Sequence, residues 1–184
     1  SSNWGTIARQ LADRYQVIVP DLRNHGQSPH DHVHNYPAMV DDVVALMDRL
    51  GLGPAVMAGH SMGGKVVMQL ALSAPERVAG LVVVDMAPIS YSHNFNLVLQ
   101  AFDAVDPGSV RNRADADVAM AALVPEPGVR AFLLQNLVKR PDGWGWRQNL
   151  AALRREQADI LAFPHHPDAD RSEEHTSELQ SRQS

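Results

Sequence analysis

The chain has 184 residues, of which 45% are hydrophobic and 20% are charged, and its formal net charge is −5. This length is enough for one domain with a sizeable core, and the acidic balance argues against an electrostatic nucleic-acid binder. Because the sequence contains no cysteine, a disulfide framework, a thiolate metal site and a cysteine nucleophile are all excluded. Apolar runs such as residues 81–84 are far too short to span a bilayer. We therefore expect a globular protein located in the cytoplasm.

The first 88 residues alternate between helical and strand patterns. In chain order, the expected elements are a helix over 4–14, a strand over 16–19, a loop over 21–35, a helix from Asn35 to Gly51, a strand over 54–58, a helix over 65–74 and a strand over 81–84. The strand segments are apolar on both faces, which is typical of a parallel sheet covered by helices. The pattern therefore predicts an α/β fold in three layers.

After Asp85 the alternation ends and the pattern becomes helical. The expected helices, which are separated by breaks rich in Pro and Gly, cover residues 93–105, 109–123, 127–139 and 145–156. No strand pattern is expected between them. Four consecutive helices inserted after a strand end predict a cap over the carboxyl edge of the sheet, and a separate helical domain is the alternative.

Both ends of the chain have unusual features. The chain begins at Ser1 rather than at Met, so we expect that a segment with the first strands is missing. From Arg171 the sequence is polar and resembles the in-frame translation of a sequencing-library adapter, and a natural disordered tail is the alternative. The expected organisation is an α/β core over 1–88 that lacks its first strands, a helical cap over 89–164, the start of a return to the core over 165–170 and a non-native tail over 171–184.

The most informative motif is Gly-His-Ser-Met-Gly-Gly at residues 59–64. It follows a predicted strand and precedes a predicted helix, which is the context of a nucleophile elbow. In so tight a turn, bulk at Gly59 or Gly63 is expected to collide with the neighbouring backbone. The turn displays Ser61 beside a helix N-terminus, where backbone N–H groups face a developing oxyanion. The motif predicts Ser61 as a nucleophile, with a simple structural turn as the alternative.

A serine nucleophile needs a base, and the base needs a carboxylate that orients it. Asp85 directly follows the strand after the elbow helix, and a right-handed crossover places that strand beside the elbow strand. Because neighbouring strands lie about 4.8 Å apart, Asp85 is predicted to lie within the span of an imidazole from Ser61. The alternatives are a structural Asp that caps the loop, and an acid that follows a later strand.

None of the histidines meets the requirements for the base. His60 adjoins the nucleophile in the turn, so its side chain is expected to point elsewhere, and His25 lies on the loop after an earlier strand. His165 and His166 come too early for a base expected beyond two further strands, and His175 lies in the tail. We therefore expect the catalytic histidine outside these 184 residues.

Other groups are candidates for the oxyanion hole and the substrate pocket. The backbone N–H of Met62, directly after the nucleophile, is expected to donate to the oxyanion. His60 and His25 are pocket candidates. Trp144 is a third candidate, and packing of the cap explains a tryptophan there equally well.

The predicted loop over 21–35 contains two polar segments. Asp21 and Arg23 are interpreted as braces of the loop, with substrate contact as the alternative. The run His-Asp-His-Val-His at 30–34 suggests a metal site, but alternate residues on an irregular loop need not converge on one ion. The default interpretation of this run is a solvated loop, and no metal is expected.

Together these residues resemble the α/β-hydrolase serine esterases, and within them the group of the bacterial esterase YbfF. The resemblance covers nearly all of residues 1–164. Its segments are Ser-Ser-Asn-Trp at 1–4, Asp-Leu-Arg-Asn-His-Gly-Gln-Ser at 21–28, Gly-His-Ser-Met-Gly-Gly-Lys at 59–65, Val-Asp-Met-Ala-Pro at 84–88 and Pro-Glu-Pro-Gly-Val-Arg-Ala-Phe-Leu-Leu at 125–134. The G-x-S-x-G pattern marks the superfamily, whereas the last two segments are more specific.

The resemblance implies hydrolysis of small-molecule carboxylic esters or thioesters through an acyl-enzyme, without a metal or organic cofactor. It also implies that Asp85 is the acid, that a His-Gly segment before Ser1 supplies a second oxyanion donor, and that a Gly-His segment after residue 170 bears the base. The 184 residues alone are therefore expected to show little or no turnover. The alternatives are another enzyme of this fold, such as a lyase or haloperoxidase, and a non-catalytic binding protein.

Overall fold

The computed structural model describes residues 4–90, 95–141 and 143–163. The chain divides into two compact units, which are described separately: unit 1 comprises Ser1–Asp42 and Tyr91–Leu161, and unit 2 comprises Val43–Ser90 and Ala162–Ser184. Helix α2 (Tyr36–Arg49) contains the boundary between Asp42 and Val43. In the described ranges, no helix combines the length and the apolar character needed to cross a membrane.

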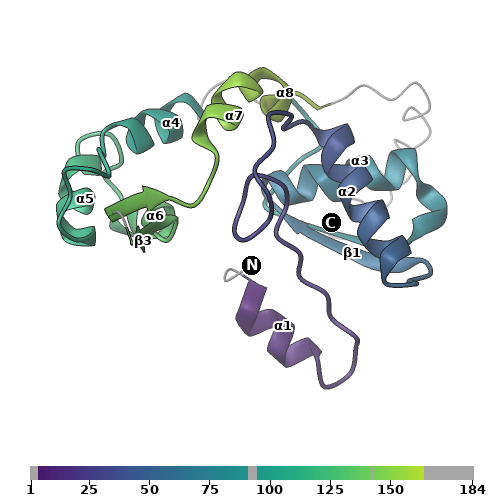
Figure 1. Cartoon of the computed structure of the whole chain (residues 1–184). Coiled ribbons are helices and arrows are strands. Elements are labelled where there is room, and N and C mark those ends of the chain that lie inside the picture. The colour runs from purple at the N-terminus through teal and green to yellow at the C-terminus, as the bar shows by residue number, and fades with distance from the viewer. Residues whose placement is uncertain (1–3, 91–94, 142, 164–184) are drawn as a thin grey trace, which may run out of the picture. The chain divides into compact units, whose positions relative to one another are not determined.

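Unit 2 is a strand–helix–strand unit, as the sequence predicts. Strand β1 (Ala55–His60) pairs in parallel with β2 (Val78–Val84), and the register runs from Met57 opposite Leu81 to His60 opposite Val84. Helix α3 (Met62–Ser73) connects them through a short 3-10 turn (Pro75–Arg77) and packs across both strands (Figure 1). The parallel pair therefore brings the carboxyl ends of β1 and β2 to one edge.

Alternation along the strands decides which face of the pair is covered. A Cβ built on Gly64 of α3 lies 3.2 Å from Cγ1 of Val83, so Val83 belongs to the face under α3. Its neighbours Val82 and Val84 point to the opposite face, where they remain 47% and 42% exposed. Within the described residues, α3 therefore covers one face of the predicted three-layer arrangement.

The prediction of a strand over 16–19 is wrong in the described structure. These residues pair with no described strand, and Ile18 is 39% exposed. A short apolar run becomes a strand only when a neighbouring strand satisfies its backbone groups, and periodicity does not supply that partner. The preceding helix is present as α1 (Gly5–Leu11).

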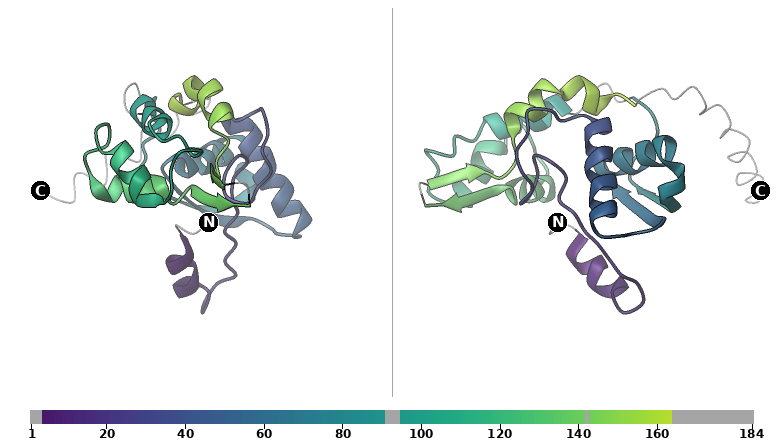
Figure 2. Two further views of the ribbon diagram at one scale, coloured as in Figure 1. Left: turned by 60° about the vertical axis from the view of Figure 1, so that its left-hand side comes forward. Right: turned by 45° about the vertical axis from the view of Figure 1, so that its right-hand side comes forward.

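Unit 1 contains the predicted series of helices together with an unexpected hairpin. The elements after residue 94 are α4 (Phe95–Asp103), α5 (Arg113–Met120), α6 (Pro127–Leu134), β3 (Leu137–Arg140), β4 (Gly143–Trp146), α7 (Leu150–Arg155) and α8 (Gln157–Leu161). Apolar side chains of α4, α5, α6 and β3 form one buried cluster, with Ala101, Ala116, Met120 and Leu137 inaccessible to solvent. The antiparallel arrows of β3 and β4 lie among the helices of this unit (Figure 2).

The hairpin corrects the prediction that no strand interrupts the helices. Gly-Trp-Gly-Trp over 143–146 alternates with a period of two, which is a strand pattern that the expected helix over 145–156 overlooked. The register places Leu137 opposite Trp146, whose ring meets Phe102 edge-on at a centroid distance of 4.8 Å. The alternation therefore turns two aromatic rings toward the cluster while glycines occupy the other face.

Arg130 connects α6 to α5 and to the loop between them. Its guanidinium forms a two-pronged ion pair with Asp117, at 2.8 Å from Nε to Oδ1 and 3.2 Å from Nη2 to Oδ2. Nη1 also donates to the carbonyls of Val124 and Pro125, at 2.9 and 2.7 Å. Since Arg130 is 9% exposed, all of these partners replace water that the guanidinium has lost.

We predict that Arg130→Met lowers the Tm of unit 1 by roughly 5–10 °C, because Asp117 and two carbonyls lose their donor. The matched control is Arg111→Met, which removes an ion pair with Asp115 on the surface, where the Arg111 side chain is 86% exposed. The control substitution should lower the Tm by about 2 °C or less. Thermal unfolding followed by circular dichroism measures both, and equal losses would contradict the assigned role of Arg130.

Candidate active site

Ser61 occupies a sharp turn between β1 and α3. Its backbone angles are φ 52° and ψ −125°, a left-handed region that a non-glycine residue rarely adopts. Its carbonyl accepts from the N–H of Gly64 at 2.8 Å and from that of Lys65 at 3.3 Å, so the helix begins at once. The Ser61 side chain forms no capping bond with α3, and the residue is exposed. The hydroxyl is thus presented outward by a strained backbone.

Close approach of the backbone explains the glycine at position 59 but not the one at 63. A Cβ on Gly59 would lie 2.1 Å from the carbonyl oxygen of Gly63, a distance that no side chain tolerates. A Cβ on Gly63 would meet nothing within 4 Å, so the expectation of a collision there is wrong. The second tight position is Gly64, whose Cβ would lie 3.1 Å from Cβ of Met86. The glycines therefore permit α3 to pack against both strand ends.

Asp85 follows β2 at the same edge at which Ser61 follows β1. The N–H of Ser61 donates to the carbonyl of Val84 at 3.2 Å, which continues the ladder one step beyond the pairing of His60 with Val84. Asp85 also has a left-handed backbone, with φ 54°, and its side chain is 87% exposed. The parallel register thus brings the two candidate catalytic residues to adjacent strand ends.

His60 contacts the carboxylate of Asp85, which sequence reasoning missed. Its Nε2 lies 3.7 Å from Oδ2 of Asp85, and its side chain is 43% exposed. The expectation was only that His60 would point away from the nucleophile. The signal lay in the order of the residues, because His60 ends the strand beside the one that Asp85 follows. An exposed ion pair at this distance contributes little to the free energy of folding. It shows instead that the side chains of His60 and Asp85 lie beside each other at this edge of the sheet.

Met62 is the first residue of α3. The amides of the first helical turn have no acceptor within the helix, so the N–H of Met62 is available to an external acceptor beside Ser61. The positive end of the helix dipole favours negative charge at the same place. The role of this N–H as the oxyanion donor stays a prediction.

The two pocket candidates of unit 1 have local partners. The Nδ1–H of His25 donates to the carbonyl of Arg23 at 3.0 Å, and burial lowers the pKa of His25. The indole N–H of Trp144 donates to the carbonyl of Arg111 at 3.2 Å, and its ring packs against the buried cluster. Packing within unit 1 therefore accounts for Trp144, and a pocket role for either residue stays a prediction.

Asp21 and Arg23 brace the loop before α2, in agreement with the favoured interpretation. The carboxylate of Asp21 accepts the N–H of Gln27 at 3.0 Å. The guanidinium of Arg23 forms a two-pronged pair with Asp42, at 2.7 and 2.8 Å. The sequence suggested this role only through the density of polar residues in the segment.

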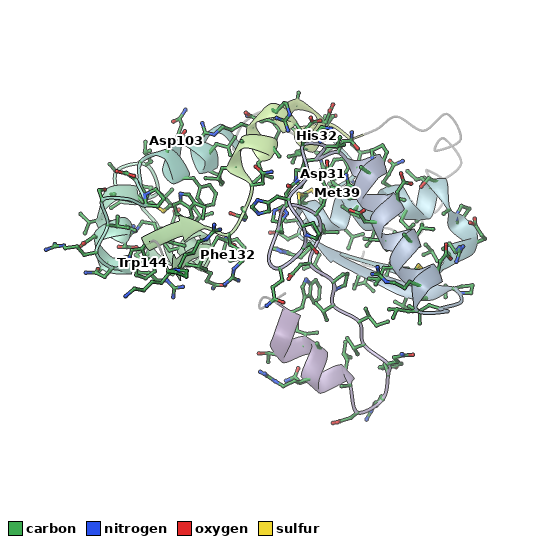
Figure 3. All side chains as sticks on the ribbon, in the orientation of Figure 1. Asp31, His32, Met39, Asp103, Phe132 and Trp144 are labelled. Carbon is green, nitrogen blue, oxygen red and sulfur yellow. The ribbon has the colours of Figure 1, made fainter. Side chains whose placement is uncertain are left out.

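The histidines of the 30–34 run do not converge, and no group of ligands able to hold a metal occurs among the described residues. His32 is exposed beside Asp31 on the loop that precedes α2 (Figure 3). His30 donates from Nε2 to the carbonyl of Arg147 at 3.0 Å. His34 is fully buried, so the expectation of a wholly solvated loop is wrong at this position. His165, His166, His175 and the 171–184 tail lie outside the described residues.

The surroundings of His34 favour its neutral form. The amide of Asn24 donates to Nδ1 of His34 at 3.3 Å, and Asn24 is itself fully buried. Burial lowers the pKa of His34 to about 4, with smaller contributions from His25 and Arg23. Asn24 also accepts from the N–H of Asp31 at 2.7 Å and from the side chain of Asn149 at 3.0 Å, so the imidazole is enclosed by a connected network.

Comparison with known proteins agrees with this geometry. Residues 1–123 match the family described as alpha/beta hydrolase fold. The sn-1-specific diacylglycerol lipase ABHD11 of Danio rerio is 42% identical over 172 residues, which cover 89% of this chain and 54% of that protein. Esterase YbfF of Escherichia coli K12 is 38% identical over 162 residues, which cover 88% of this chain and 62% of that protein. A solved structure titled marine microorganism esterase superposes with a TM-score of 0.86 at 29% identity, covering 91% of this chain and 67% of that one.

An elbow serine between a parallel strand and a helix, with an acid after the neighbouring strand, defines the class of α/β-hydrolase-fold proteins. The chain belongs to the alpha/beta hydrolase family, and its similarity to the esterases and lipases confirms the predicted fold class. The chain spans just over half to about three fifths of the length of these curated relatives.

We predict opposite outcomes for two glycines of the elbow. Gly59→Ala should destabilise unit 2 by roughly 3 kcal/mol, because the new methyl group meets the Gly63 carbonyl. Gly63→Ala, the matched control, should fall between no change and about 0.5 kcal/mol of added stability, since the position is open and helical. Urea unfolding measures both variants, and a larger loss for Gly63→Ala would overturn the packing argument.

We also predict that the stability of unit 1 falls as the pH drops from 6.5 to 4. Because the pKa of His34 is about 4 in the folded state and 6.5 ordinarily, the unfolded chain binds more protons within this window. The free energy of unfolding should therefore decrease by up to ~1.4 kcal/mol per pH unit for this group, and His25 adds a slope of the same sign.

The variant His34→Gln tests this, because glutamine keeps an acceptor for Asn24 and does not titrate. Chemical unfolding at several pH values should show a flatter slope for His34→Gln and an unchanged slope for His32→Gln, whose side chain is 86% exposed. An identical slope in wild type and His34→Gln would show that His34 does not carry the pH dependence.

Proposed function

We propose that this chain acts as part of a serine hydrolase that cleaves carboxylic ester or thioester bonds through an acyl-enzyme. The observation that carries the proposal is the exposed Ser61 at φ 52°, at the same sheet edge as Asp85. Membership of the alpha/beta hydrolase family supports the proposal, and so do relatives named as an esterase and a lipase.

In the proposed reaction, the Ser61 hydroxyl attacks the acyl carbon while a histidine removes its proton. The carbonyl oxygen becomes an oxyanion, which accepts a hydrogen bond from the backbone N–H of Met62. The tetrahedral intermediate expels the alcohol or thiol, which takes the proton from the histidine. Water then attacks the acyl-enzyme, assisted by the same base, and releases the acid. No metal or organic cofactor takes part in these steps.

We propose that the base comes from outside the printed sequence, in a longer protein of the length of its relatives. In the described part of unit 2, His60 is the one histidine, and it adjoins Ser61 in the chain while contacting Asp85. The Asp85 carboxylate, 87% exposed, remains accessible to a second imidazole. Asp85 would orient that imidazole and stabilise the imidazolium that forms.

The relatives' printed names, a diacylglycerol lipase and an esterase, support a small-molecule ester as substrate. We also propose a cytoplasmic location, which is consistent with a chain that contains no cysteine and needs no oxidising compartment.

We predict that Ser61→Ala in the longer protein abolishes labelling by a fluorophosphonate and lowers kcat on p-nitrophenyl acetate by about 10⁴-fold or more. Ser73→Ala is the matched control, because the Ser73 hydroxyl bonds the carbonyl of Gln69 within α3. The 184 residues alone should show little or no turnover. Full ester hydrolysis in Ser61→Ala would overturn the proposed nucleophile, and labelling of Ser61 without ester hydrolysis would favour another activity on this fold.

A further inference from the structure

Lys65 is a buried cation in the first turns of the elbow helix. It lies four residues after Ser61 and is 2% exposed, although a lysine ammonium is strongly hydrated in water. Burial lowers the pKa of Lys65, in keeping with the loss of that hydration. Charged groups are almost never this buried unless they are paired or hydrogen-bonded, so the partners of the ammonium are informative.

The Lys65 side chain bonds a segment distant in the sequence. Its Nζ donates to the carbonyl of Ala162 at 2.9 Å, across 97 positions of the chain. Ala162 is the first residue of unit 2 after the 91–161 segment, which belongs to unit 1. The backbone of the same lysine donates to the carbonyl of Ser61 at 3.3 Å. One residue therefore connects the proposed nucleophile with the point at which the chain returns to its unit.

A second hydrogen bond joins the returning segment to the loop that follows Asp85. The N–H of Phe163 donates to the Ser90 hydroxyl at 3.0 Å, across 73 positions. Ser90 is the last residue of unit 2 before the 91–161 segment, and it ends the loop that begins at Asp85. A direct hydrogen bond thus joins the segment that leaves unit 2 at Ser90 to the segment that returns to it at Ala162. We call this arrangement of Lys65, Ser90, Ala162 and Phe163 the neck.

We propose that Lys65 and Ser90 are positioning residues that fix the neck to the two candidate catalytic strand ends. This inference rests on the proposed function. The chain after Phe163 leads toward the part proposed to carry the base. The neck sets where that part begins relative to Ser61 and Asp85. The Lys65 side chain acts by holding the Ala162 carbonyl against the first turns of α3, and Ser90 acts through the loop of Asp85, so neither touches the reacting atoms.

The energetics favour a positional role over a purely stabilising one. Taking an ammonium out of water is costly, and hydrogen bonds to carbonyls offset that cost only in part. A methionine of similar length would fill the same space without that cost. A buried lysine is therefore a poor choice for stability alone, whereas a donor that reaches one particular carbonyl specifies where the returning chain lies.

The test uses Lys65→Met and Ser90→Ala in the longer protein. The controls are Lys139→Met, which changes the only other lysine, an exposed residue of β3, and Ser73→Ala. The first readout is amide hydrogen exchange at Phe163, which does not depend on activity. Both neck variants should accelerate exchange at this amide at least tenfold, and both controls should leave it unchanged.

The second readout is steady-state kinetics on p-nitrophenyl acetate. Because misplacement by about 1 Å costs up to about 100-fold, the neck variants should lower kcat by about 10- to 100-fold and change KM less than twofold. Lys65→Arg, which restores a donor, should recover part of kcat. A merely structural lysine would instead show a lower Tm with unchanged kcat in the folded enzyme.

The outcomes separate the neck from the proposed function. If both neck variants keep the wild-type hydrogen exchange at Phe163 and the wild-type kcat, the proposed positioning role of Lys65 and Ser90 is wrong. If Lys65→Met fails to fold, Ser90→Ala decides, since Ser90 is exposed and its truncation leaves the core intact. If wild type lacks ester hydrolysis, the proposed function fails, and exchange at Phe163 still reports whether the neck exists.

Discussion

The constraint on which the elbow depends is the close approach of Gly59 to the backbone of Gly63. At this position a Cβ would lie 2.1 Å from a carbonyl oxygen, so the chain turns from strand to helix within a space that only glycine leaves free. The turn imposes φ 52° on Ser61 and starts α3 at the next residue. Because α3 then packs across both strands, the parallel register that brings Asp85 to the same edge depends on this turn.

Several buried polar side chains, in both units, bond specific and distant partners. Arg130 exchanges water for one carboxylate and two carbonyls, and Lys65 bonds a carbonyl 97 residues away. Asn24, fully buried, accepts from Asp31 and Asn149 and donates to His34. Such groups cost more to bury than apolar ones, so each of them determines which segments meet more than how tightly they are held.

The sequence-based predictions of secondary structure and burial are wrong where the outcome depends on residues distant in the sequence, or where a strand period competes with a helical one. The run over 16–19 is apolar enough for a strand, but no described strand pairs with it. The expected helix over 145–156 includes Trp146, although its alternation with Trp144 and the glycines favours the strand that the structure has. His34 was expected in solvent, and it is enclosed because Asn24 and the loop fold over it. The hydrophobic pattern of one segment does not show which distant residues pair with it or cover it.

By itself, the sequence determined the strand–elbow–helix–strand order, the family and the candidate nucleophile, because glycine spacing and apolar periodicity are local consequences of backbone sterics. It also indicated Asp85, since a right-handed crossover leaves few places for the next strand. Only the tertiary structure decided that Gly64 rather than Gly63 is the second tight position, that His60 contacts Asp85 and that Lys65 reaches Ala162. These contacts join residues through the register and through helix packing, which no single segment specifies.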